Sequence, residues 1–159
     1  MKLKTKLSTM LDLIRHEGYM DTVYLDTENL PTVGVGHLIR DTDPEYHLEV
    51  GDVVSDERIE ELFLRDIDEA IETAKTLTSL KEHPEEVQSI IVNMAFNLGF
   101  FRLRGFKRML RALELFDYQS AAREMQDSKW YKQVRNRSIE LVSRMEQARP
   151  LKGVNRFSQ

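Results

Sequence analysis

Carboxylates are the side chains of this sequence best suited to catalysis. The 159 residues include no cysteine, which excludes thiol nucleophiles, disulfides and zinc-thiolate sites. No serine lies in a Gly-x-Ser-x-Gly turn, and the four histidines show no spacing typical of metal ligands. The candidates for acid and base chemistry are therefore the sixteen glutamates and eleven aspartates.

Glu17 and Asp26 form one candidate pair. Glycoside hydrolysis uses one carboxyl group that donates a proton to the leaving oxygen, and a second that stays ionised and acts on water or on the developing cation. Glu17 lies at the predicted end of a helix, whereas Asp26 lies in a polar turn. In so acidic a chain, about one Glu has an Asp nine residues later by chance, and most such acids are merely solvated. Spacing alone therefore does not select this pair.

A helix and a small hairpin would position the two carboxylates. Apolar residues at three- and four-residue spacing predict a helix from residue 3 with one buried face, and Gly18 ends it. Two short strands are predicted over 19–25 and 32–36, around a polar turn. The residues expected on the buried face of the helix are Leu3, Leu7, Met10, Leu11 and Ile14.

Helices are predicted for most of the remaining chain. Ser55 is a suitable N-cap for a helix with a continuous apolar stripe, which would span roughly 33 Å. Pro84 begins a nearly all-apolar core helix that we expect to end at Gly99. Shorter helices are expected over 106–114, 117–126 and 137–148. The stripe of the long helix consists of Ile59, Leu62, Phe63, Ile67, Ala70, Ile71, Ala74 and Leu77.

Composition and charge bound the class of protein. With 41% hydrophobic and 31% charged residues, the sequence is typical of one compact soluble domain, and no apolar run approaches the ~18 residues of a membrane span. The net charge is -4, but residues 41–90 carry sixteen acids against four bases, and residues 91–159 carry fourteen bases against six acids. The basic half suits an anionic polymer, such as nucleic acid or cell-wall glycan, and solvated helix faces explain it equally well.

Three motifs in order carry a resemblance to a known family. The segments Glu17-Gly18, Tyr24-Leu25-Asp26-Thr27 and Thr32-Val33-Gly34-Val35-Gly36-His37-Leu38 closely resemble the signature of the phage lysozymes, or endolysins, of glycoside hydrolase family 24. The resemblance continues along the chain and covers roughly residues 10–149. It implies an α+β, lysozyme-like two-lobe fold, with a small N-terminal β-hairpin lobe and a larger helical lobe joined by a long helix.

The resemblance also implies a domain organisation. We expect a single lysozyme domain over residues 1–150, with the hairpin lobe at about 18–55. The helical lobe would cover about 56–149 together with the N-terminal helix. Residues 151–159 would form a frayed tail.

Roles for individual residues follow from the resemblance. Glu17 would be the general acid, while Asp26 and Thr32 would together hold and activate the attacking water, which implies inversion at the anomeric carbon. Leu38 and Phe96 fall at substrate-cleft positions of the family.

Further residues would support this site. Arg137 matches a basic residue that pairs with the catalytic glutamate, and His37 and Asp66 match a family ion pair, which makes His37 structural. No metal or cofactor is expected. The sequence departs from the family at Asn29-Leu30-Pro31, in the turn before Thr32, and at two positions that face the sugar. Those two residues are Met109 and Glu124.

The expected protein is an endolysin that hydrolyses the β-1,4 bond between N-acetylmuramic acid and N-acetylglucosamine in bacterial peptidoglycan during host-cell lysis. We expect a monomer without stable membrane insertion, without a nucleic-acid partner and without a leader. It would accumulate in the host cytoplasm and then act on the periplasmic wall.

Three alternatives stay open at this stage. One is a catalytically weak peptidoglycan-binding module, and a second is a transglycosylase that uses a hydroxyl of the glycan in place of water. The third is a nucleic-acid-binding helical protein, in which Trp130 and Tyr131 of the basic half stack on bases.

Overall fold

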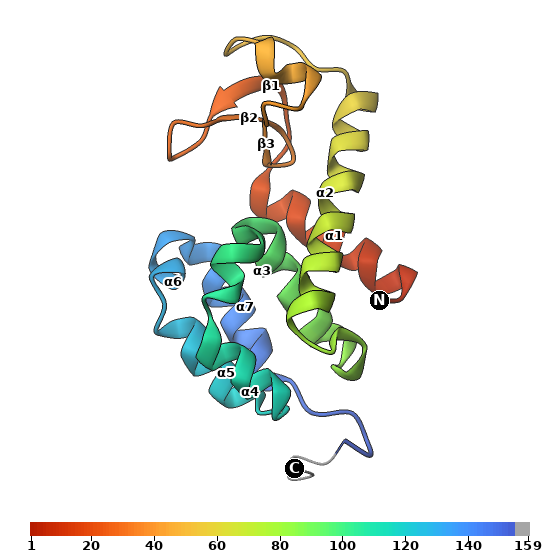
Figure 1. The fold of residues 1–159 in the computed structure, drawn as a ribbon, viewed down its shortest axis with the longest axis vertical. Coiled ribbons are helices and arrows are strands. Elements are labelled where there is room, and N and C mark those ends of the chain that lie inside the picture. The colour runs from red at the N-terminus through yellow and green to blue at the C-terminus, as the bar shows by residue number, and fades with distance from the viewer. Residues whose placement is uncertain (155–159) are drawn as a thin grey trace. The chain divides into compact units, whose positions relative to one another are not determined.

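The computed structural model describes residues 1–154, which form seven α-helices, two short 3-10 helices and one three-stranded antiparallel sheet (Figure 1). The predicted α+β fold class is confirmed. Contacts divide the chain into two compact units. The sheet unit is Met10–Asp68, and the helical unit combines Met1–Thr9 with the chain from Glu69 onward.

The sheet unit contains strands β1 (Met20–Leu25), β2 (Pro31–Gly34) and β3 (His37–Leu38) in the order β1-β2-β3. The two predicted strands are β1 and β2, but β3 was not predicted, because two residues are too few to show a pattern. A 3-10 helix, η1 (Pro44–His47), follows the sheet. The core of this unit consists of Val23, Val33, Ile39, Val54, Ile59 and Leu62.

The long helix α2 (Asp56–Leu77) has the predicted length of 22 residues. Ser55 caps it as expected, because its Oγ accepts a hydrogen bond from the backbone N–H of Arg58 at 3.2 Å. The predicted apolar stripe is buried from Ile59 to Ala74. The first part of α2, up to Asp68, belongs to the sheet unit.

The helical unit is built from consecutive helices. Its central helix follows Pro84, as predicted. Gly99 has φ 73° and ψ 175°, so it interrupts the helix where an end was predicted, but another helical segment follows. No described helix is long and apolar enough to cross a bilayer. The elements are η2 (Leu80–Glu82), α3 (Glu85–Arg104), α4 (Lys107–Glu114), α5 (Tyr118–Gln126), α6 (Lys129–Gln133) and α7 (Arg135–Gln147).

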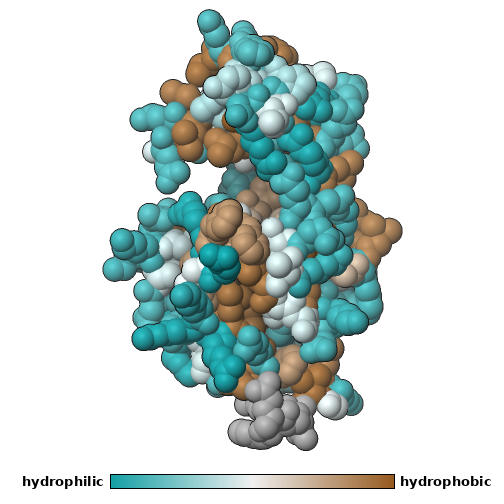
Figure 2. Space-filling view, in the orientation of Figure 1, coloured by the Kyte–Doolittle hydropathy of each residue, from teal (hydrophilic) through white to brown (hydrophobic). Residues whose placement is uncertain are grey.

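The N-terminal helix α1 (Leu3–Glu17) has the predicted bounds, but its predicted buried face was wrong. The buried row is Thr5, Thr9 and Leu13, four residues apart on one side of the helix. The hydroxyl of Thr9 lies 2.8 Å from the carbonyl of Thr5 and 2.8 Å from Oγ of Ser89, so this buried hydroxyl has hydrogen-bond partners on both sides. Figure 2 shows an apolar patch where the N-terminal part of α1 runs in Figure 1. The exposed apolar residues of α1 are Leu3, Leu7, Leu11 and Ile14.

Candidate active site

Glu17 is the last residue of α1, and its carboxylate lies against the turn between β2 and β3. Gly18 ends the helix with φ +76°, and its N–H donates to the carbonyl of Ile14 at 2.9 Å. A Cβ atom at Gly36 would lie 2.5 Å from Oε2 of Glu17, and Gly36 has φ +62°. Glycine is therefore required at position 36 both by its backbone conformation and by the half-buried carboxylate beside it.

Asp26 begins a tight turn that connects β1 to β2. Its Oδ1 accepts hydrogen bonds from the backbone N–H groups of Glu28 at 2.8 Å and Leu30 at 2.9 Å. Asn29 has φ +59°, a conformation that Asn tolerates better than most residues. The departure from the family at Asn29-Leu30-Pro31 thus still gives a hydrogen-bonded turn, and this turn holds the carboxylate of Asp26.

Thr32 lies on the central strand, two residues after that turn. It pairs with Tyr24 of β1 and with Leu38 of β3, and only 3% of its surface is exposed. Its hydroxyl donates to the carbonyl of Leu30 at 3.0 Å. Because that bond uses the hydroxyl hydrogen, Oγ1 can act only as an acceptor toward a further group such as water.

Tyr24 lies within the influence of both candidate carboxylates, and it was not predicted as part of the site. The pKa of its phenol lies above the ordinary value, first because of burial and then because of the negative charges of Glu17 and Asp26. The charges of both carboxylates therefore act on one phenol. The signal available in the sequence was its position opposite Thr32 in a hairpin.

His37 lies next to Gly36 and is 2% exposed. Its Nδ1 lies 2.5 Å from Oδ2 of Asp66, and its Nε2 lies 2.8 Å from Oδ2 of Asp43. Hydrogen bonds from the ring to these carboxylates raise the pKa of His37 against the opposing effect of burial. His37 was predicted to pair with Asp66, and the structure adds Asp43, six residues farther along the chain.

A family model described as Phage lysozyme matches residues 14–148, which is most of the chain and includes every residue of this site. The protein belongs to the phage lysozyme family. Members of this family are lysozymes, so the chain is a lysozyme-type glycosidase that acts on peptidoglycan.

Three curated proteins show how widely similar chains occur. A probable T4-type lysozyme 1 of Dictyostelium discoideum is 28% identical, with 88% of this chain and 95% of that protein covered. A probable T4-type lysozyme 2 of the same organism is 27% identical, over 86% of this chain and 93% of that protein. The pre-baseplate central spike protein Gp5 of Enterobacteria phage T4 is 30% identical over 79% of this chain, which corresponds to 25% of that longer protein.

The remaining predicted site residues are divided between the two units. Leu38, in β3 of the sheet unit, is 45% exposed. Phe96 is half-buried on α3 of the helical unit, and Arg137 is buried in α7 of the same unit. The pairing of Arg137 with Glu17 and the roles of Leu38 and Phe96 in substrate binding stay predictions.

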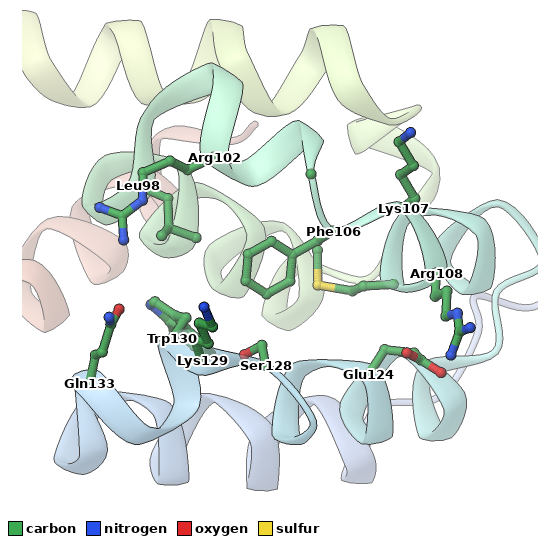
Figure 3. Close-up of a pocket in the computed structure, with 12 residues that line it drawn as sticks. Leu98, Arg102, Phe106, Lys107, Arg108, Glu124, Ser128, Lys129, Trp130 and Gln133 are labelled. Atoms are coloured by element: carbon green, nitrogen blue, oxygen red, sulfur yellow. The ribbon is translucent and has the colours of Figure 1, made fainter.

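The helical unit contains a pocket with a volume of about 580 Å³. Figure 3 shows Leu98 and Arg102 of α3 on one side, Lys129 and Trp130 of α6 on the other, and Phe106 directed between them. Both departures noted at sugar-facing positions lie here. The lining residues are Leu98, Arg102, Gly105, Phe106, Lys107, Arg108, Met109, Glu124, Ser128, Lys129, Trp130 and Gln133.

Trp130 is a core residue of this unit, with 3% of its surface exposed. Its indole N–H donates to Oδ1 of Asn97 at 2.7 Å, and its ring meets that of Phe106 edge to face. Stacking of this ring on a nucleic acid base is therefore excluded.

Within residues 1–154, no group of three His, Cys, Asp or Glu side chains is arranged to hold a metal ion.

Proposed function

We propose that this protein hydrolyses the β-1,4 bond between N-acetylmuramic acid and N-acetylglucosamine, with Glu17 as the general acid. Asp26 and Thr32 hold and activate the attacking water, and the anomeric carbon is inverted. The observation that carries the proposal is geometric: the carboxylate of Glu17 lies against Gly36 in the β2–β3 turn, and the carboxylate of Asp26 is held in the β1–β2 turn of the same sheet. A helix end and a hairpin turn of the sheet unit thus supply the two carboxyl groups that glycoside hydrolysis requires.

The local contacts suit the two carboxylates to different catalytic roles. Glu17 lies at a helix end with its carboxyl group against Gly36, and this contact orients the carboxyl group as the proposed acid. The carboxylate of Asp26 is held in place by two backbone N–H groups, which orient it as the proposed base. The hydroxyl of Thr32 donates its hydrogen to the carbonyl of Leu30. Its oxygen therefore acts toward the attacking water as a hydrogen-bond acceptor.

The substitution Glu17→Gln tests the role of the acid. The amide cannot donate a proton to the leaving oxygen, so kcat on purified peptidoglycan falls by at least about 10²-fold. Glu28→Gln, in the neighbouring turn, removes an exposed carboxylate and is the matched control that keeps full activity. Equal activity of Glu17→Gln and wild type would contradict the assignment.

Product analysis separates the remaining alternatives. Mass spectrometry of digested peptidoglycan should show reducing N-acetylmuramic acid ends, and proton NMR of fresh product should show the α anomer. Anhydro ends would indicate a transglycosylase, and a β product would indicate retention. Binding to peptidoglycan without new reducing ends would identify a binding module instead, and steeply salt-dependent DNA binding a nucleic-acid-binding protein.

We further propose that the protein acts in host-cell lysis, accumulating in the host cytoplasm before it reaches the periplasmic wall. Support for this role comes from membership of the phage lysozyme family. Fractionation of infected or expressing cells would test it, and recovery of the protein with assembled virions would contradict it.

A further inference from the structure

The buried charges around His37 lie directly beside the turn that touches Glu17. We define the His37 cluster as His37, Asp43, Asp66, Arg40 and Arg65. An ionised carboxylate only accepts hydrogen bonds, and each ring nitrogen faces one, Nδ1 facing Asp66 at 2.5 Å and Nε2 facing Asp43 at 2.8 Å. Both ring nitrogens must therefore carry hydrogen, and the ring is an imidazolium.

Asp43 accepts hydrogen bonds from three other members of the cluster. Its side chain is 1% exposed, and besides His37 it accepts from the backbone N–H of Arg40 at 2.8 Å and from the guanidinium of Arg65 at 2.9 Å. These hydrogen bonds hold the pKa of Asp43 well below its usual range despite burial. Asp43 thus joins β3, the loop after it and helix α2.

The cluster also fixes the strands that carry the candidate site. His37 pairs with Val33 of β2, and Leu38 pairs with Thr32. Gly36, adjacent to His37, is the residue against which the carboxylate of Glu17 lies. A displacement of the imidazolium would move the backbone of Gly36, and Glu17 would lose the surface that orients it.

We propose that Asp43 is a positioning residue for the hydrolysis. Together with Asp66 it holds the His37 imidazolium, and through it the β2–β3 turn, so that Gly36 keeps the Glu17 carboxyl group oriented toward the glycosidic oxygen. This inference rests on the proposed function, in which Glu17 is the acid.

The test compares two buried carboxylates of the same unit. Asp43→Asn removes the charge that faces His37 while keeping the shape. Glu45→Gln is the matched control, because the 7%-exposed side chain of Glu45 pairs with Arg58 at 2.6 Å, whereas the carboxylates that face His37 are those of Asp43 and Asp66. Kinetics on peptidoglycan would be measured together with urea unfolding and with the backbone amide signal of Gly36 in a nitrogen-15 spectrum.

We expect Asp43→Asn to lower kcat about tenfold while KM stays within about twofold, because the acid is misplaced and substrate binding is not. The amide signal of Gly36 should shift in Asp43→Asn and stay in place in Glu45→Gln, even where both variants lose similar stability. Arg65→Gln, at a half-exposed residue that contacts Asp43, should give a smaller fall of kcat and a smaller shift of the Gly36 signal. This variant replaces Asp43→Asn in the test if Asp43→Asn does not fold.

The pH dependence gives a second readout. The charged groups that face His37 are Asp43 and Asp66, with Arg40 and Arg65 behind them. Without the Asp43 charge, His37 should lose its proton at lower pH, and the alkaline limb of the kcat profile should move to lower pH with it.

Two results would overturn the proposal. One is a kcat for Asp43→Asn equal to that of wild type in the folded state, and the other is an equal fall of kcat in Glu45→Gln. An inactive wild type would instead contradict the proposed function, and the Gly36 signal would still decide whether Asp43 orders the turn.

Discussion

The two units each bury one histidine, and the two residues differ in charge. His37 in the sheet unit is 2% exposed and lies between two carboxylates. His83 in the helical unit is 1% exposed and lies between two hydroxyls, with Nε2 2.9 Å from Oγ1 of Thr78 and Nδ1 3.0 Å from the hydroxyl of Tyr118. Burial lowers the pKa of His83 to about 4, whereas hydrogen bonds to carboxylates raise the pKa of His37.

Partners rather than depth thus decide the protonation of a buried histidine. A neutral imidazole has one donor and one acceptor nitrogen, and a hydroxyl adapts to either, so His83 is satisfied without charge. Carboxylates cannot adapt in this way, so His37 must be charged. The same residue type therefore serves as an ion beside the candidate catalytic turn and as a neutral core residue in the helical unit.

The largest effect is expected when the ion is removed. His37→Gln leaves the carboxylates of Asp43 and Asp66 buried without the cation between them, which should cost about 3–5 kcal/mol of unfolding free energy. Urea denaturation at pH 7 measures this loss. His47→Gln, at an exposed histidine of the same unit, should change little, and equal losses in both variants would contradict a charged His37.

A smaller effect is expected from acid acting on His83. Its folded pKa of about 4 lies below the unfolded value. Between these two pH values the imidazole is protonated in the unfolded chain but stays neutral in the folded chain. The contribution of His83 to stability should fall by about 3 kcal/mol as pH drops from about 6.5 to about 4. The difference between the pH profiles of wild type and His83→Gln isolates this effect.

His37 should show the opposite dependence. Because its pKa is raised in the folded state, its contribution is complete below the unfolded value of about 6.5 and is lost as pH rises through the folded pKa. Imidazole proton shifts measured by NMR would follow both rings separately. Titration of both rings over the same pH range would contradict the difference in pKa between His37 and His83.

The smallest effect concerns one hydroxyl beside His83. Tyr118→Phe removes the partner of Nδ1 and leaves that nitrogen buried without a hydrogen bond, which should cost about 1–3 kcal/mol. Thermal unfolding measures the cost, and Tyr46→Phe, at an exposed tyrosine, is the control. No loss in Tyr118→Phe would show that the hydroxyl does not satisfy His83.

Much of the fold could be predicted from local patterns. The apolar stripe of α2, its Ser55 cap and the start of α3 after Pro84 depend on neighbouring residues along the chain, and they agree with the structure. The face of α1 could not be predicted in this way, because Thr9 is buried by a partner at Ser89, eighty residues away. Strand β3 and helix α6 are too short to show a period.

The site shows the same division. Residue types and order single out Glu17 and Asp26, but the pairing of Tyr24 with Thr32 and the proximity of Gly36 to Glu17 depend on strand register and turn geometry. Asp43 is one of twenty-seven acids, and nothing local distinguishes it from a solvated one. Its significance follows from contacts with His37 and Arg65 across the fold.

The division of the chain has a consequence for biosynthesis. Residues Met1–Thr9 belong to the helical unit, although the rest of that unit begins only at Glu69. On the ribosome these first residues emerge long before Ser89, the partner of Thr9, has been made. The sheet unit can therefore complete its contacts before the N-terminal turns of α1 find their partners, and removal of those turns should destabilise the helical unit, which is synthesised after the sheet unit.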